Sequence, residues 1–117
     1  MNNTFILKKT NVVELEVEVK PRIVQSSVVT TITDIKNVQN PDIKTGTKFK
    51  IKIPNKNVTY RLITQVFDLT LFPNKATISY NVFIDGKKST IPLNDIGLSL
   101  NPNIPIEFIA TFAFIFL

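Results

Sequence analysis

Strict alternation of apolar and charged residues is the feature that most constrains this chain. Residues 13–20 read VELEVEVK and residues 48–53 read KFKIKI. Successive side chains of an extended strand point to opposite sides, so a period of two separates the apolar residues from the charged ones. No stretch has the 3.6-residue period of an amphipathic helix. The pattern therefore predicts strands that are buried on one face and solvated on the other.

Similar strand patterns recur along the whole chain between short turns. Residues 23–35 are rich in β-branched residues, with a slip in alternation near Val28 and Val29 that indicates a bulge or a switch of face. Residues 36–46 carry turn formers without a clear period, so we expect them to form the longest loop. Turn signals about every 8–12 residues predict seven or eight strands. The fold class is all-β: one antiparallel β-sandwich domain over residues 1–117, jelly-roll or Ig-like.

Two hairpins are predicted from turn signals. Residues 54–57 would join strand 48–53 to the strand that follows it, with Ile53 opposite Val58 and Lys50 opposite Arg61. The second strand is expected to change phase around residues 65–67. Asp85-Gly86 predicts a two-residue turn, across which the pairs Tyr80/Ile91 and Ile78/Leu93 would be opposed.

The amino-acid composition argues against an enzyme. The chain has no His and no Cys, so the most versatile catalytic side chains and the usual zinc and iron–sulfur ligands are absent. With only three glycines it has no phosphate-binding loop and no nucleophile elbow. We therefore expect no catalytic residues, no metal site and no cofactor.

Charged residues form two candidate features on the predicted strands. A net charge of +5 and the alternating lysines suggest a face that binds nucleic acid or another polyanion. It would consist of Lys48, Lys50, Lys52 and Arg61. The acidic strand offers a second interpretation, in which the lysines pair with Glu14, Glu16 and Glu18 in a ladder of opposite charges. A third is that the lysines face only water and protect an edge strand from aggregation.

The carboxyl-terminal strand, residues 106–117, has two apolar sides. Its last ten residues, FIATFAFIFL, carry no charge on either side, although a sheet that faces water should show one polar side. One interpretation is a central strand buried on both faces within the monomer. The favoured interpretation is that a partner covers its second side. The candidate assembly residues are Phe108, Ile109, Phe112, Phe114, Ile115, Phe116 and Leu117.

These features predict a non-enzymatic structural subunit of a larger homo- or hetero-assembly with other structural proteins. A phage capsid or tail accessory protein of a virion fits this description. The opening residues contain no signal peptide and no transmembrane segment, so we expect synthesis in the cytoplasm. The alternative is a module that binds nucleic acid or another polyanion through its basic face. A small-molecule or lipid pocket between the sheets is a third hypothesis.

Overall fold

The fold is known from a computed structural model that describes residues 2–21, 26–69, 74–89, 96–102 and 104–117. Within these residues there are ten strands and no helix. The strands are β1 (Asn2–Leu7), β2 (Val13–Pro21), β3 (Ser26–Asp34), β4 (Asn37–Thr45), β5 (Lys48–Ile53), β6 (Val58–Asp68), β7 (Asn74–Ile84), β8 (Lys87–Lys88), β9 (Ile96–Leu100) and β10 (Ile106–Phe116).

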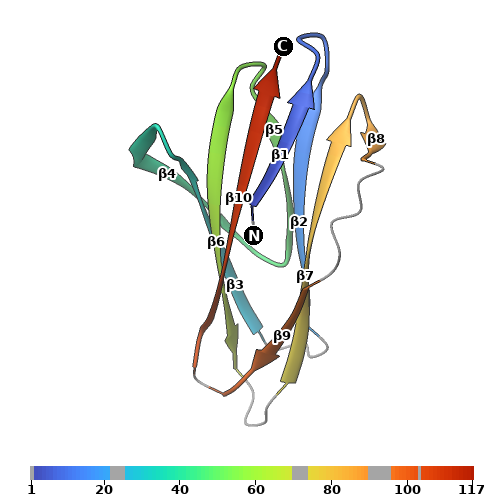
Figure 1. Cartoon of the computed structure of the whole chain (residues 1–117). Coiled ribbons are helices and arrows are strands. Elements are labelled where there is room, and N and C mark those ends of the chain that lie inside the picture. Colours follow the sequence, from blue (N-terminus) through green and yellow to red (C-terminus); the bar gives the residue numbers. More distant parts are fainter. Residues whose placement is uncertain (1, 22–25, 70–73, 90–95, 103) are drawn as a thin grey trace.

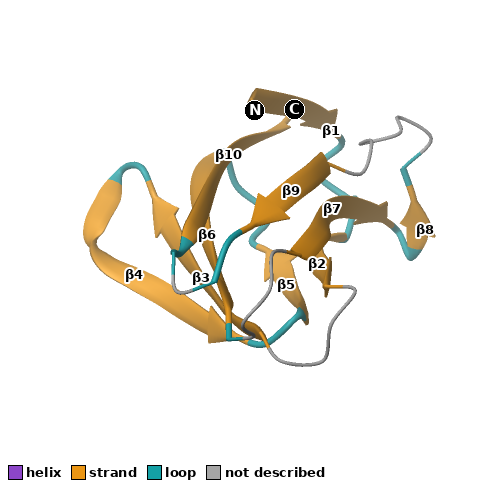
Figure 2. Cartoon of the chain, turned by 90° about the horizontal axis from the view of Figure 1, so that it is seen from below, coloured by secondary structure: helices purple, strands orange, loops and turns teal. Residues whose placement is uncertain are grey.

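The strands form two packed sheets, so the predicted all-β sandwich is confirmed (Figures 1 and 2). Sheet A has the order β1-β10-β6-β3-β4. Sheet B has the order β5-β2-β7-β8, and β9 also pairs with β7. The described strand pairs are antiparallel except for β1 with β10, which run parallel. That parallel amino-terminal strand was not predicted.

The alternating strands bury the faces that the sequence predicts. On β2 the buried side consists of Val13, Leu15, Val17 and Val19, each at most 2% exposed. One side of β10 packs into the same core; its buried residues are Ala110, Phe112, Phe114 and Phe116. The Tyr80 ring of β7 lies 5.1 Å from the Phe112 ring, which joins the two sheets across the core.

Residues 36–46 are not a loop, which corrects the prediction for this stretch. Most of them form β4, which pairs with β3 through Val29 opposite Thr45 and Thr31 opposite Ile43. The register shifts between Ile32 and Asp34, where β4 contains extra residues. This irregularity hides the period of two, and every residue of β4 except Lys44 is exposed, so no apolar alternation marks the strand.

The predicted hairpin between residues 48–53 and the next strand is wrong. β5 pairs with β2 in sheet B, whereas β6 pairs with β10 and β3 in sheet A. Residues 54–57 therefore carry the chain from one sheet to the other. Both strands have an apolar side toward the same core, so side-chain alternation alone could not distinguish a hairpin from a crossover.

β6 and β3 each keep one phase, contrary to the predicted changes at residues 65–67 and 28–29. Thr64 and Asp68 stay on the buried side of β6, and Thr30 stays on the buried side of β3. The Thr30 and Thr64 hydroxyl groups lie 3.0 Å apart and share a hydrogen bond. A buried hydroxyl that has a hydrogen-bond partner can occupy a core position, and this pairing makes the pattern look interrupted.

The Asp85-Gly86 turn is confirmed. Ile84 lies opposite Lys87, and both turn residues have positive φ angles, 52° and 80°, as a two-residue type I′ turn requires. Further along, Ile78 lies opposite Ile96 of β9. The predicted pairs Tyr80/Ile91 and Ile78/Leu93 involve Ile91 and Leu93, which lie outside the described residues.

Candidate functional site

The outer face of sheet B brings the acidic and basic strands together. β2 and β5 are neighbours, and their register places Glu14 opposite Lys52, Glu16 opposite Lys50 and Glu18 opposite Lys48. Opposite charges directly across an antiparallel pair contribute about 0.2–1 kcal/mol each. We call these six residues the charge ladder.

The Glu18 end of the charge ladder has further contacts. The Lys48 ammonium lies 3.5 Å from the Glu18 carboxylate, and that of Lys20 lies 3.1 Å from the other oxygen of Glu18. The hydrogen bond from Lys20, together with the charge of Lys48, holds the pKa of the Glu18 carboxyl below its usual value. A carboxylate held by two lysines is stabilised in its charged form.

The middle of the charge ladder rests on β7. The Lys50 ammonium lies 4.2 Å from the centre of the Phe83 ring, a cation–π contact. The Asn81 amide donates a hydrogen bond of 3.1 Å to the Glu16 carboxylate. The Glu16 carboxylate and the Lys50 ammonium therefore each have a partner on β7.

Arg61 does not join the lysines, which corrects the predicted four-residue anion-binding face. It projects from the outer face of sheet A, between the inward-facing Tyr60 and Leu62. Lys48, Lys50 and Lys52 project from the outer face of sheet B. The two groups thus lie on opposite sides of the sandwich, because β5 and β6 belong to different sheets.

The structure divides the candidate assembly strand between two environments. Phe112, Phe114 and Phe116 are buried in the core, and Phe108 is half-buried against it. Ile109 lies on the outer side and is 48% exposed, and Ile115 on the same side is half-buried. Leu117, directly after the strand, is 73% exposed.

The outward side of β10 belongs to a broader surface of low charge. β1 adds Ile6, which is 68% exposed and lies opposite Ile115. On the other side of β10, Ile63 of β6 lies opposite Ile109, and Thr31 of β3 lies opposite Ile63. We call this surface the isoleucine–threonine face; its uncharged residues include Thr4, Ile6, Thr31, Thr59, Ile63, Ile109, Thr111, Ala113 and Ile115.

Two charged residues complete the isoleucine–threonine face. Arg61 lies opposite Thr111, and Glu107 lies opposite Gln65, whose amide is 3.5 Å from the Glu107 carboxylate. Both charged side chains are exposed. Within the described part of the chain, neither of them forms an ion pair. Sequence reasoning missed the β1, β3 and β6 contributions, since only the folded sheet places β1 and β6 beside β10 and β3 beside β6.

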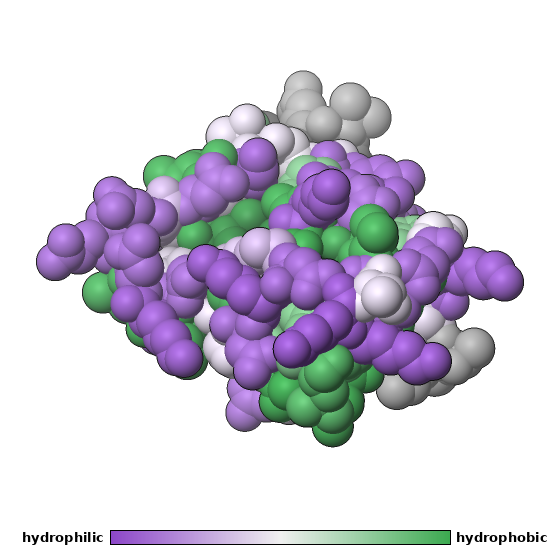
Figure 3. Space-filling view, turned by 90° about the horizontal axis from the view of Figure 1, so that it is seen from above, coloured by the Kyte–Doolittle hydropathy of each residue, from purple (hydrophilic) through white to green (hydrophobic). Residues whose placement is uncertain are grey.

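One end of the sandwich is tied together by side-chain hydrogen bonds. The Asp85 carboxylate accepts hydrogen bonds of 2.8 Å from the Val12 backbone N–H and from the Asn11 amide. These bonds hold the pKa of Asp85 below its usual value. Asn57 accepts a 2.7 Å hydrogen bond from the Phe116 N–H. Seen from above, this end shows mainly hydrophilic residues, with hydrophobic ones visible between them and in a projecting group at one side (Figure 3).

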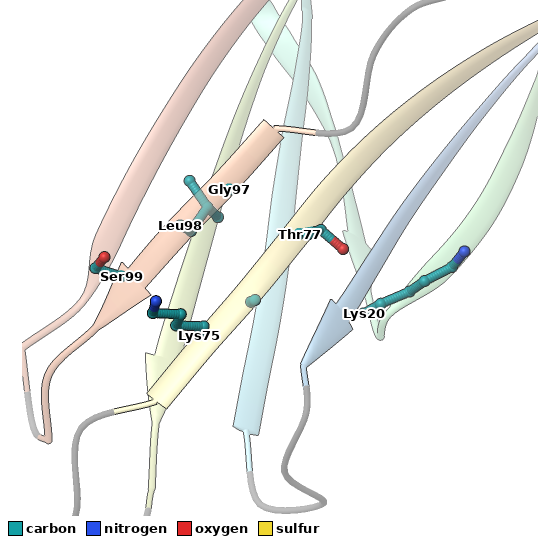
Figure 4. Close-up of a pocket in the computed structure, with 7 residues that line it drawn as sticks. Lys20, Lys75, Thr77, Gly97, Leu98 and Ser99 are labelled. Atoms are coloured by element: carbon teal, nitrogen blue, oxygen red, sulfur yellow. The ribbon is translucent and has the colours of Figure 1, made fainter.

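A hollow of about 600 Å³ lies at the junction of β7 and β9, and Lys75, Thr77 and Ser99 contribute to its lining. Its two ammonium groups do not converge. Lys20 projects on the far side of β7 from Lys75 (Figure 4), and Lys20 already contacts Glu18. The hollow is therefore an open depression without a group of side chains aimed at one ligand.

The described residues offer little sign of other chemistry. Among them, no group of three or more acidic side chains is placed to hold a metal ion. In the same residues there is no helix with the length and apolar character needed to span a membrane. Comparison with known proteins found no matching family model, curated protein or solved structure.

Proposed function

We propose that this chain is a non-enzymatic structural subunit that enters a larger assembly through the isoleucine–threonine face of sheet A. A virion shell or tail is one assembly of this kind. The observation that carries the proposal is the exposure of Ile6 and Ile109 on a broad sheet face that has only two charges among its described residues. Large exposed patches of this type mark protein–protein contact sites.

The charge ladder supports the same proposal from the other side of the molecule. Its lysines have glutamate partners in the same chain, which lowers the positive charge that a polyanion would meet. Arg61 lies on the opposite side of the sandwich, so the alternative polyanion-binding face lacks its fourth member. We therefore expect the outer face of sheet B to be solvated and the outer face of sheet A to contact a protein partner.

Light scattering of the purified chain at micromolar concentration tests the proposal. We expect a mass that is a multiple of 13.2 kDa, because an exposed apolar face is covered in the stable state of the protein. The double variant Ile6→Lys/Ile109→Lys should lower this mass toward the monomer, since each added ammonium would have to be desolvated in the interface.

A matched control adds two lysines to the other sheet. Thr77→Lys/Ser99→Lys changes the net charge equally but on the outer face of sheet B, and it should leave the mass unchanged. A clean wild-type monomer at these concentrations would contradict the proposal. Equal dissociation by both double variants would show that net charge, and not the isoleucine–threonine face, controls association.

A further inference from the structure

The isoleucine–threonine face carries one positive and one negative charge, and their positions are related. Arg61 lies opposite Thr111 of β10, and Glu107 precedes Thr111 by four residues on that strand. At a rise of about 3.3 Å per residue, the two charges are roughly 13 Å apart along the sheet. Between them lies the pair Ile63 and Ile109, which are directly opposite each other.

We propose that the occupant of this face is a second copy of the same chain, bound about a two-fold axis that passes next to Ile63 and Ile109. In this arrangement Arg61 of each copy meets Glu107 of the other. The isoleucine pair of one copy packs on the same pair of its partner. This inference rests on the proposed function and names the partner of that same face.

Charge complementarity favours a second copy over another partner. A two-fold interface places the same patch on both sides, so a charged group must find its opposite within that patch. The face meets this condition with Arg61 and Glu107, which are exposed and form no ion pair among the described residues. A uniformly acidic or basic partner would instead meet one repulsive charge.

The size of the face also fits a dimer. Strands β1, β10, β6 and β3 lie at a spacing of about 4.8 Å and average about nine residues in length, which gives a patch of roughly 20 Å by 30 Å. Two such patches would bury about 1,200 Å² in total, which lies at the lower end of the range for specific interfaces. Sheets pack face to face in this way when their side chains interdigitate.

Charge reversal tests the inference. Arg61→Glu puts two glutamates against each other at both symmetric contacts, and Glu107→Arg does the same with two arginines. Each single variant should raise the dimer dissociation constant on the order of tenfold to a hundredfold, measured by sedimentation or light scattering over a concentration series. Lys75→Glu, a charge reversal on the outer face of sheet B, is the matched control and should have no effect.

Mixing the two single variants is the decisive measurement. In a mixed dimer every introduced charge faces its opposite, so equal amounts of the two variants should recover the wild-type mass. The double variant Arg61→Glu/Glu107→Arg should also recover it alone. Neutral variants, Arg61→Gln and Glu107→Gln, should weaken association less and should not rescue each other.

The outcomes separate this inference from the proposed function. A wild-type monomer contradicts both. A wild-type multimer whose mass is unchanged by either reversal retains the structural role but overturns the two-fold arrangement. Dissociation by the single variants without recovery on mixing also overturns it, since the charges would then face different partners. Circular dichroism of each variant establishes that the exposed substitutions leave the fold intact.

Discussion

On the outer face of sheet B, glutamates and lysines face each other across β2 and β5, whereas the outer face of sheet A consists mainly of isoleucine and threonine. Both faces lie on the same sandwich and both have an apolar side beneath them. In the charge ladder each carboxylate has a lysine opposite it, and Glu18 and Lys48 form an ion pair. The isoleucine–threonine face leaves Ile6 and Ile109 exposed, which is why we propose that a partner covers it.

The largest loss of folding stability is expected for a substitution on the inner side of β10, because the core that it helps to form holds the two sheets together. Phe112→Ala removes a ring that is fully buried and packs against Phe5 and Tyr80. It should lower the free energy of unfolding by about 3–5 kcal/mol, measured by urea denaturation at fixed protein concentration. Ile109→Ala on the outer side of the same strand should cost much less. Equal losses would mean that both sides of β10 serve the core of the monomer.

A smaller effect is expected when the charge ladder is broken in its middle. Lys50→Glu puts a third carboxylate next to Glu14 and Glu16 and removes the cation that lies over Phe83. The free energy of unfolding should fall by about 1 kcal/mol. Adding Glu16→Lys restores opposite charges and should recover part of this loss in a double-mutant cycle. Zero coupling between positions 16 and 50 would show that the ladder contributes nothing to stability.

The cation–π contact accounts for a smaller share. Phe83→Leu keeps an apolar side chain under Lys50 but removes the ring, and should cost about 0.5 kcal/mol in urea denaturation. The same substitution in a Lys50→Met background should cost less, because no cation remains above the ring. An identical cost in both backgrounds would assign the effect to packing alone.

The smallest effect is expected on the pH dependence of folding stability at Glu18. The pKa of Glu18 is lower in the folded chain than its ordinary value of 4.5, so its contribution is present above that value and is lost as pH falls through the folded-state pKa. Because the half-buried carboxyl lies on the solvent-facing side of sheet B, where water screens its ion pairs, this contribution should be about 0.5 kcal/mol or less. Glu18→Gln should therefore be slightly less stable than wild type at pH 7 and equal to it near pH 2, in thermal melts. A constant difference at every pH would exclude the titration of Glu18 as its cause.

Sequence reasoning succeeded where one period of two extends over a whole strand. Val13 to Val19 on β2 and the odd-and-even division of β10 were read correctly, because burial on one face selects apolar residues at every second position. It failed at β4, whose exposed residues lack such selection. It also failed at Thr64 and Asp68, since polar side chains can lie on the buried side when they have partners there.

The sequence by itself determined that the chain forms strands, which side of most strands is buried, and where Asp85-Gly86 turns. Only the tertiary structure decided which strands are neighbours. It separated β5 from β6, set Glu16 against Lys50, and placed β1 next to β10 so that Ile6 joins Ile115. The physical reason is that alternation records the burial of each residue, whereas pairing depends on hydrogen bonds between backbones, which are the same for nearly every residue type.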